Sequence, residues 1–391
     1  MMGAYHQLGH HSESMVLESE LEAFRGVILS PVNYGPGETL EQCVRFRQDK
    51  PSLDLIFDPQ LYVPSSGRGC LPQWRHMPGG LDTADASSVD WWRGALEEVL
   101  VSCSAFAPNA VCSPATFPHR GFVNAHYTLW VEVANALEEL TRGEIVRPLA
   151  TALVGLQDLG REHRHLEVAS ILTKYRGRGI YLVLWDETLP RRERSDSASL
   201  EAALRLIKLL ADAGYDVTVA FTSTEMILWK AVGAQNVATG KFFNLRRFTS
   251  GRFEPDTEGG GRNLPYWLEP SLLAFLREAD LRRFRRDFPL SSRHESNPFS
   301  QKILQGIDQA DQRAWLADSW RQYLRWFATT EADYEGTSAE GKLFNTAEMI
   351  NTANEAWRGV RNAHLRFEEE ANDGSWVRAW DIALGELSRK P

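Results

Sequence analysis

The sequence contains little cysteine and none of the patterns that bind metal through it. Only 4 of its 391 residues are Cys, and no two of them form a C-x-x-C pair. This spacing argues against a disulfide framework and against a cysteine zinc site, and it fits a reducing compartment. The four residues are Cys43, Cys70, Cys103 and Cys112.

Signals for export and for membrane insertion are also missing. Residues 1–24 lack the basic and apolar regions of a signal peptide, and no run of apolar residues is long enough to span a bilayer. We therefore predict a cytoplasmic protein without a membrane span. We expect residues 1–24 to form a flexible polar segment.

The sequence has fewer basic than acidic residues. It contains 43 Lys and Arg residues and 52 Asp and Glu residues, which gives a net charge of −9. This balance argues against nonspecific nucleic-acid binding by the whole surface. The motifs G-x-G-x-x-G, G-x-x-x-x-G-K-[ST], G-x-S-x-G and H-E-x-x-H are all absent. We therefore expect no nucleotide cofactor of the familiar kinds and no bound metal.

The pattern that is present is an alternation of short apolar runs with amphipathic helical segments. Near-continuous apolar runs of this kind are typical of parallel strands buried on both faces. Seven units within about 240 residues predict a (β/α)8, or TIM, barrel, with an open doubly wound sheet as the alternative. The seven predicted strands lie within residues 26–34, 53–63, 109–117, 144–155, 179–186, 215–223 and 235–240.

The last unit of the predicted barrel is irregular. Its strand would lie at residues 263–268, where Pro265 removes one backbone donor from the sheet. Beyond residue 290 only helical patterns continue, and they carry six Trp residues. We therefore predict a barrel over residues 25–290 and a helical C-terminal domain over 297–391. Most of the Trp side chains are expected in its core, and some in contact with a partner protein.

Catalytic groups of a parallel barrel come from the carboxyl ends of the strands. Asp58 and Asp186 each follow an apolar run directly, in "LIFDPQ" and "LVLWDE". A carboxylate beside a hydrophobic core can have the shifted pKa that acid/base or nucleophilic chemistry requires, so these two are the predicted catalytic residues. The alternative is that each only caps the next helix or holds a turn.

The stretch "ATGKFFNLRRF" (238–248) places three cations after the last clear strand. Loops in this position of a barrel often bind phosphate, so we predict an anion clamp of Lys241, Arg246 and Arg247. The alternative is a helix start with a polar face. The further predicted substrate-binding residues, at other strand ends and in the insertion 65–88, are Asn33, Gln60, Arg75 and Thr222.

Together these features predict an enzyme acting on a phosphate-bearing ligand, either a nucleotide or the end of a nucleic acid, by glycosyl or hydrolytic transfer. The alternative is a non-enzymatic barrel scaffold whose Trp-rich helices dock a partner protein. The glycine-containing segment 249–262 is predicted to form a mobile loop over the ligand site.

Overall fold

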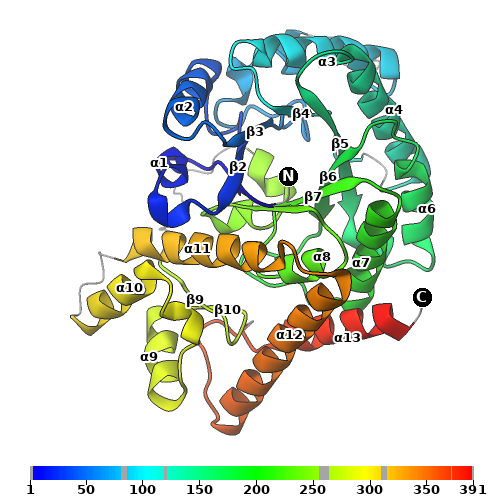
Figure 1. Cartoon of the computed structure of the whole chain (residues 1–391). Helices are drawn as coiled ribbons and strands as arrows, with labels where there is room; N and C mark the ends of the chain where they lie inside the picture. The colour runs from blue at the N-terminus through cyan, green and yellow to red at the C-terminus, as the bar shows by residue number, and fades with distance from the viewer. Residues whose placement is uncertain are drawn as a thin grey trace.

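The chain forms a closed barrel of eight parallel strands (Figure 1). The computed structural model describes residues 3–80, 86–118, 121–254, 264–309, 315–370 and 372–389. The strands follow one another around the barrel in chain order, and β8 pairs with β1 to close it. They are β1 (Gly3–Gln7), β2 (Phe24–Leu29), β3 (Asp54–Phe57), β4 (Ala110–Cys112), β5 (Arg147–Gly155), β6 (Gly179–Trp185), β7 (Asp216–Ala220) and β8 (Asn236–Thr239).

The predicted barrel is confirmed, but its first strand lies where we expected a flexible segment. β1 falls within residues 1–24, and all five of its residues are buried between β2 and β8. The sequence "GAYHQ" contains no apolar run, which is why the pattern did not reveal a strand. Six of the other seven strands lie within the predicted segments, and β2 begins two residues before its segment, at Phe24.

The strand predicted at residues 263–268 does not belong to the barrel. There the chain enters a separate antiparallel hairpin of β9 (Trp267–Glu269) and β10 (Ala274–Leu276). Since β1 already fills the eighth position of the barrel, no place remains for another parallel strand.

Helices cover the outside of the barrel (Figure 1). In α7 the buried Leu200, Leu204 and Ile207 recur at helical spacing, and Asp196 caps the first turn through the N–H of Ala198. The helices between the strands are α1 (Glu13–Val16), α2 (Pro36–Asp49), α3 (Val89–Ser104), α4 (Asn124–Leu140), α5 (Leu156–Leu159), α6 (Arg164–Leu172), α7 (Ser197–Asp212) and α8 (Met226–Ala231).

The C-terminal helices pack on the barrel. Helix α11 lies against β1 and α8, where a regular barrel has the helix that follows its eighth strand. The Tyr323 hydroxyl of α11 lies 2.6 Å from Oγ1 of Thr239 in β8, and the Phe327 and Phe24 rings stack. The helices of this region are α9 (Glu278–Asp287), α10 (Pro298–Asp308), α11 (Leu316–Tyr334), α12 (Ala339–Asn362) and α13 (Ser375–Arg389).

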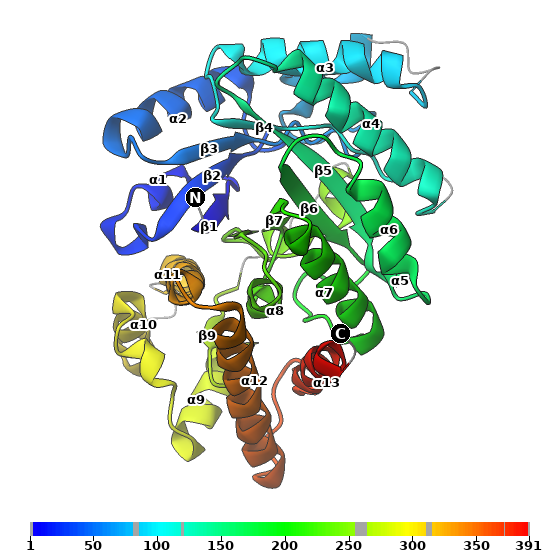
Figure 2. The same ribbon diagram turned by 45° about the vertical axis from the view of Figure 1, so that its right-hand side comes forward.

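Helix α13 lies beside α7 in both Figure 1 and Figure 2. Trp380 of α13 donates its indole N–H to the carbonyl of Arg194, and Arg205 of α7 donates to the carbonyl of Glu386. Five of the six predicted Trp side chains are buried, and the sixth, Trp320, is partly buried. Their role is therefore mainly in packing. No described helix is both long and apolar enough to cross a membrane.

Candidate functional site

The carboxyl ends of the strands carry strained backbone as well as polar side chains. His11, Gln60 and Phe221 have φ values of 52°, 55° and 54°, a left-handed conformation that non-glycine residues rarely adopt. They follow β1, β3 and β7. Such strain costs of order 1–3 kcal/mol per residue. Ala107, His163, Leu273 and His364 share this conformation elsewhere, so the polar side chains, rather than the backbone, make this end of the barrel the candidate site.

Asp58 lies at the end of β3 and contacts residues across the barrel. Its Oδ1 accepts the N–H of Gln60 at 3.0 Å, and its Oδ2 accepts the hydroxyls of Tyr62 at 3.1 Å and Tyr181 at 3.5 Å. Because Tyr181 belongs to β6, this contact crosses the barrel interior. Burial raises the pKa of Asp58 to about 6, against the opposing effect of these donors and of Arg252.

Ser30 joins two of the predicted substrate-binding residues to this cluster. Its Oγ accepts a hydrogen bond from Asn33 Nδ2 at 2.7 Å and lies 3.3 Å from Gln60 Oε1. Arg252 also donates to Ser30, through Nη2 at 3.1 Å, whereas its buried Nε has no partner among the described residues. Asp58, Gln60 and Asn33 thus lie in one hydrogen-bonded cluster, which also includes Arg252.

The barrel mouth above Asp58 is closed by the loop that follows β8. Phe248 packs against Tyr62 and Phe221, with ring centroids 4.7 and 4.9 Å apart, and Phe253 lies beside it. Ser66 fixes this loop by donating to the carbonyl of Phe253 at 2.6 Å. Asp58 is 2% exposed, so a ligand does not reach it in this arrangement.

Asp186, the second predicted catalytic residue, is held in a different network. Its Oδ2 lies 2.6 Å from Arg194 Nε and 3.5 Å from Arg247 Nη1, and Oδ1 accepts the N–H of Thr188. Among the described residues it shares no hydrogen-bond partner with Asp58. Burial acts to raise the pKa of Asp186, but the charges of Arg194 and Arg247 outweigh burial and lower it.

Two further carboxylates complete this ion cluster. Arg194 Nη1 lies 2.7 Å from Glu225, and Arg247 Nη2 lies 3.5 Å from Glu193. Three carboxyl groups thus face two guanidinium groups. Burial and the neighbouring charge of Glu225 raise the pKa of Glu193 to about 7. Arg247 Nη1 and Nη2 both contact carboxylates of the cluster, whereas its buried Nε has no partner among the described residues, and the side chain does not line the pocket formed by the two other predicted clamp residues.

Lys241 and Arg246 line one open pocket, which we call the β8 pocket. It has a volume of about 670 Å³ and lies beside the carboxyl end of β8. Its walls come from the loop after β6, the loop after β8, the segment before β9 and the start of α11. They are formed by Leu189, Pro190, Arg191, Lys241, Phe242, Phe243, Asn244, Arg246, Leu264, Tyr266, Ser319 and Trp320.

Aromatic rings surround both cations of the β8 pocket. The guanidinium of Arg246 lies 3.6 Å from the centre of the Tyr323 ring and 4.7 Å from that of Phe243. Its Nε and Nη2 donate to the carbonyls of Gly240 and Lys241. Nη1 has no hydrogen-bond partner in the described part of the chain. The side chain as a whole is only 3% exposed, and it lines the pocket.

Gly240 allows this loop to turn closely over the barrel. A Cβ atom at Gly240 would lie 2.5 Å from the Cβ of Leu245 and 2.9 Å from the carbonyl oxygen of Gln7. A side chain at this position would therefore push Lys241 and Arg246 out of place.

The remaining predicted residues lie elsewhere. Thr222 is fully buried, and its Oγ1 has no partner among the described residues. Arg75 is exposed and pairs with Glu98 of α3. The segment 249–262, predicted as a mobile loop, lies outside the described residues from position 255 onward.

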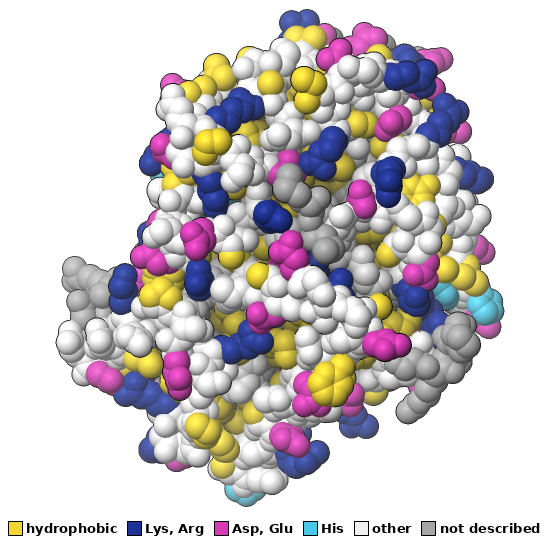
Figure 3. All heavy atoms as spheres, viewed as in Figure 1, with side chains coloured by type: hydrophobic (Ala, Val, Ile, Leu, Met, Phe, Trp, Pro, Cys, Tyr) yellow, Lys and Arg dark blue, Asp and Glu magenta, His cyan; other side chains and the backbone are white. Residues whose placement is uncertain are grey.

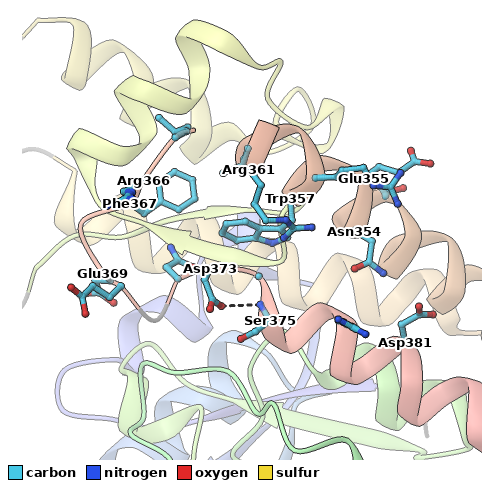
Figure 4. A pocket seen from close by; sticks show the side chains of 18 of the residues that line it. Asn354, Glu355, Trp357, Arg361, Arg366, Phe367, Glu369, Asp373, Ser375 and Asp381 are labelled. Carbon is cyan, nitrogen blue, oxygen red and sulfur yellow. Dashed lines mark hydrogen bonds between the residues drawn. The ribbon is translucent and has the colours of Figure 1, made fainter. Parts of the chain in front are cut away.

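A larger cavity of about 1290 Å³ lies between α12 and α13 (Figure 4). Arg361 and Trp357 lie near the centre, Arg366 and Glu369 on one side, and Glu355 and Asp381 on the other. The Trp357 indole N–H is already used by the carbonyl of Leu272. Because its walls carry charges of both signs, this cavity favours neither an anionic nor a cationic ligand. The β8 pocket is therefore the stronger candidate site.

Comparisons with known proteins give no family. No family model matches the chain, and no curated protein matches it in sequence. A tryptophan synthase alpha chain from Legionella pneumophila subsp. pneumophila is similar in structure, with a TM-score of 0.34 and 10% identity over 86% of this chain and 94% of that chain. An AP endonuclease of family 2 from Brucella melitensis has a TM-score of 0.34 and 15% identity over 64% of this chain and 96% of that chain. At these values neither likeness bears on function.

Proposed function

We propose that this TIM barrel is an enzyme that binds a small phosphate- or carboxylate-bearing molecule in the β8 pocket. The observation that carries the proposal is that Lys241 and Arg246, both from the loop after the eighth strand, line one open pocket. Loops in this position bind phosphate in many TIM barrels. An ammonium and a guanidinium group both bind the oxygens of such an anion, and the guanidinium also fixes its orientation.

The pattern of surface charge supports a small ligand over a nucleic-acid strand. Figure 3 shows Lys and Arg side chains interspersed with Asp and Glu side chains over the face seen in Figure 1. The chain as a whole carries a charge of −9. A polyanion would be repelled by such a surface, whereas a small anion meets only the local charge of the pocket.

The geometry does not support the paired-carboxylate chemistry expected of Asp58 and Asp186. Asp186 lies between two guanidinium groups, which stabilise its charge and leave it a weak base. Asp58 can exchange a proton but is buried and does not line the β8 pocket. The proposed function therefore does not include glycosyl or hydrolytic transfer by Asp58 and Asp186.

Calorimetric titration tests the proposal. Inorganic phosphate, glycerol 3-phosphate, a nucleoside monophosphate and uncharged glycerol would be added to the wild type and to the Lys241→Met, Arg246→Met and Arg75→Met variants. We expect one or more of the anions to bind, glycerol not to bind, and each pocket variant to lose about tenfold or more in affinity. Arg75→Met is the matched control, because Arg75 is exposed and remote from the pocket.

Two results would contradict the proposal. One is the absence of anion binding to the wild type at millimolar concentrations. The other is equal affinity in all four proteins. Thermal unfolding of each variant separates loss of the pocket charge from loss of the fold.

A further inference from the structure

The amino group of Lys241 has unusual surroundings for a lysine, because the residue is only 4% exposed although it lines the β8 pocket. Nζ donates one hydrogen bond, to the carbonyl of His11 at 2.7 Å. It also lies 4.8 Å from the centre of the Phe242 ring and 4.7 Å from that of Trp320. In the described part of the chain it forms no ion pair, so no carboxylate holds it in the charged form.

The charged groups around Lys241 come from two other elements. Glu13 of α1 favours the charged amine, but its carboxylate already accepts the Tyr34 hydroxyl at 2.7 Å. Arg321 of α11, itself paired with Glu18, disfavours the charged amine. Burial is the largest effect, and with Arg321 it lowers the pKa of Lys241 to about 8. At pH 7 about one amine in ten is then uncharged, against fewer than about one in a thousand for an ordinary lysine.

An uncharged amine in an aromatic pocket is a nucleophile, and the pocket also supplies an anchor for an anion. Arg246 Nη2 donates to the backbone carbonyl of Lys241 at 2.7 Å, so the two side chains arise from one short turn. Because Nη1 has no hydrogen-bond partner among the described residues, Arg246 can hold a carboxylate or phosphate while another part of the same molecule reaches Lys241. Desolvated lysines of this kind form Schiff bases with carbonyl compounds.

We propose that Lys241 forms an imine with a small aldehyde or ketone that carries a carboxylate or phosphate group. The nitrogen lone pair attacks the carbonyl carbon and gives a carbinolamine. Loss of water then forms the C=N bond, and both amine hydrogens leave in that water. The step needs no oxidant or reductant. It rests on the proposed function, because Arg246 must bind the anionic group for the carbonyl to be positioned.

Borohydride trapping on the full chain tests this assignment. The probes are glyoxylate, glycolaldehyde phosphate and uncharged glycolaldehyde, each followed by sodium borohydride, which adds hydride to the imine carbon and makes the link permanent. Peptide mass mapping then locates the adduct. We expect at least about tenfold more labelling of Lys241 than of Lys174, an exposed lysine remote from the pocket. Comparison of the two charged probes separates carboxylate from phosphate preference.

Two variants, Lys241→Arg and Arg246→Met, separate imine formation from anion binding. Lys241→Arg keeps the positive charge, so it should still bind anions in calorimetry but give no adduct at position 241. Arg246→Met should reduce labelling by the charged probes at least about tenfold more than it reduces labelling by glycolaldehyde, because only the charged probes use the anion contact of Arg246. Labelling of Lys241 no stronger than that of Lys174 would overturn the imine assignment, and the proposed function would survive if anions still bind. Equal labelling by charged and uncharged probes would overturn the anionic substrate class.

Discussion

The guanidinium of Arg246 lies 3.6 Å from the centre of the Tyr323 ring, and this contact joins the loop after β8 to helix α11. The next residue, Arg247, belongs to the ion cluster around Asp186 instead. Lys241, five residues before Arg246, donates to the carbonyl of His11. Three cations that form one basic stretch in the sequence therefore have three separate roles, and only Lys241 and Arg246 line the β8 pocket.

Arg247→Leu should strongly destabilise the fold. The substitution leaves Asp186, Glu193 and Glu225 buried with Arg194 as their one remaining cation. Removing one partner from a buried ion pair typically costs about 3–5 kcal/mol. We expect a loss of this size in urea unfolding, and Arg75→Leu, which removes an exposed pair, should leave the unfolding midpoint unchanged. A loss no larger in Arg247→Leu than in Arg75→Leu would mean that the cluster does not hold the loop.

Asp58 should make the protein less stable as the pH rises from about 4 to 6. Burial raises the pKa of Asp58 to about 6 in the folded state, whereas an unfolded Asp has a pKa near 4. The folded state therefore binds this proton more tightly. Its contribution is fully present below about pH 4 and is lost as the pH rises through 6, with a total change of roughly 3 kcal/mol.

The measurement is the difference in unfolding free energy between the wild type and Asp58→Asn across this pH range. The asparagine does not titrate, so the contributions of other groups cancel in the difference. We expect the wild type to lose stability relative to the variant between pH 4 and 6. A difference that stays constant, or that moves in favour of the wild type, would show that Asp58 is ionised throughout.

Most of the barrel could be predicted because a buried parallel strand must be apolar on both faces. β1 escaped this rule. Its Gln7 accepts the backbone N–H of Phe221 at 2.7 Å, and its Tyr5 donates to Asp54 at 2.7 Å. These partners satisfy the buried polar groups of β1 from distant parts of the chain, so no local pattern marks the strand.

The sequence predicts where the residues of the candidate site lie, but it does not predict which residues they contact. Asp58 and Lys241 were found because they directly follow strands, which places them at the carboxyl end of any parallel barrel. The ion pairs that Asp186 forms with Arg194 and Arg247 could not be predicted in the same way. Arg194 lies in the charged run "RRER", which is typical of an exposed loop, yet this side chain is only 3% exposed and reaches Asp186 and Glu225. Only the folded chain brings these residues together.

Gly240→Ala should weaken anion binding and also destabilise the fold. The added methyl group would overlap Leu245 and the carbonyl of Gln7, so the loop carrying Lys241 and Arg246 must move. Overpacking of this kind usually costs about 1–3 kcal/mol. Gly94→Ala in α3 is the matched control, because nothing lies within 4 Å of its added Cβ, and it should stabilise by about 0.5–1 kcal/mol. Phosphate affinity equal in the two variants would show that the pocket does not depend on this turn.

Helix α11 is attached to the barrel by a buried ion pair. Lys230 of α8 and Glu331 of α11 form an ion pair of 2.7 Å, with side chains only 1% and 2% exposed. Lys230 also donates to the carbonyl of Gln235 at 2.9 Å. If α11 serves as the helix that closes the barrel, breaking this pair should lower the stability of the whole chain and not only that of the C-terminal region.

Lys230→Met leaves the Glu331 carboxylate buried without its cation, and we expect a loss of about 3–5 kcal/mol in a single unfolding transition. The double variant Lys230→Met with Glu331→Leu removes both charges and should recover most of that loss, because an apolar pair of similar volume avoids the desolvation cost. Urea unfolding followed by both far-UV circular dichroism and Trp fluorescence measures the effect. Coincident transitions would show that barrel and helices unfold together. Two separate transitions, of which Lys230→Met shifts the midpoint of only one, would instead mean that the C-terminal helices unfold independently of the barrel.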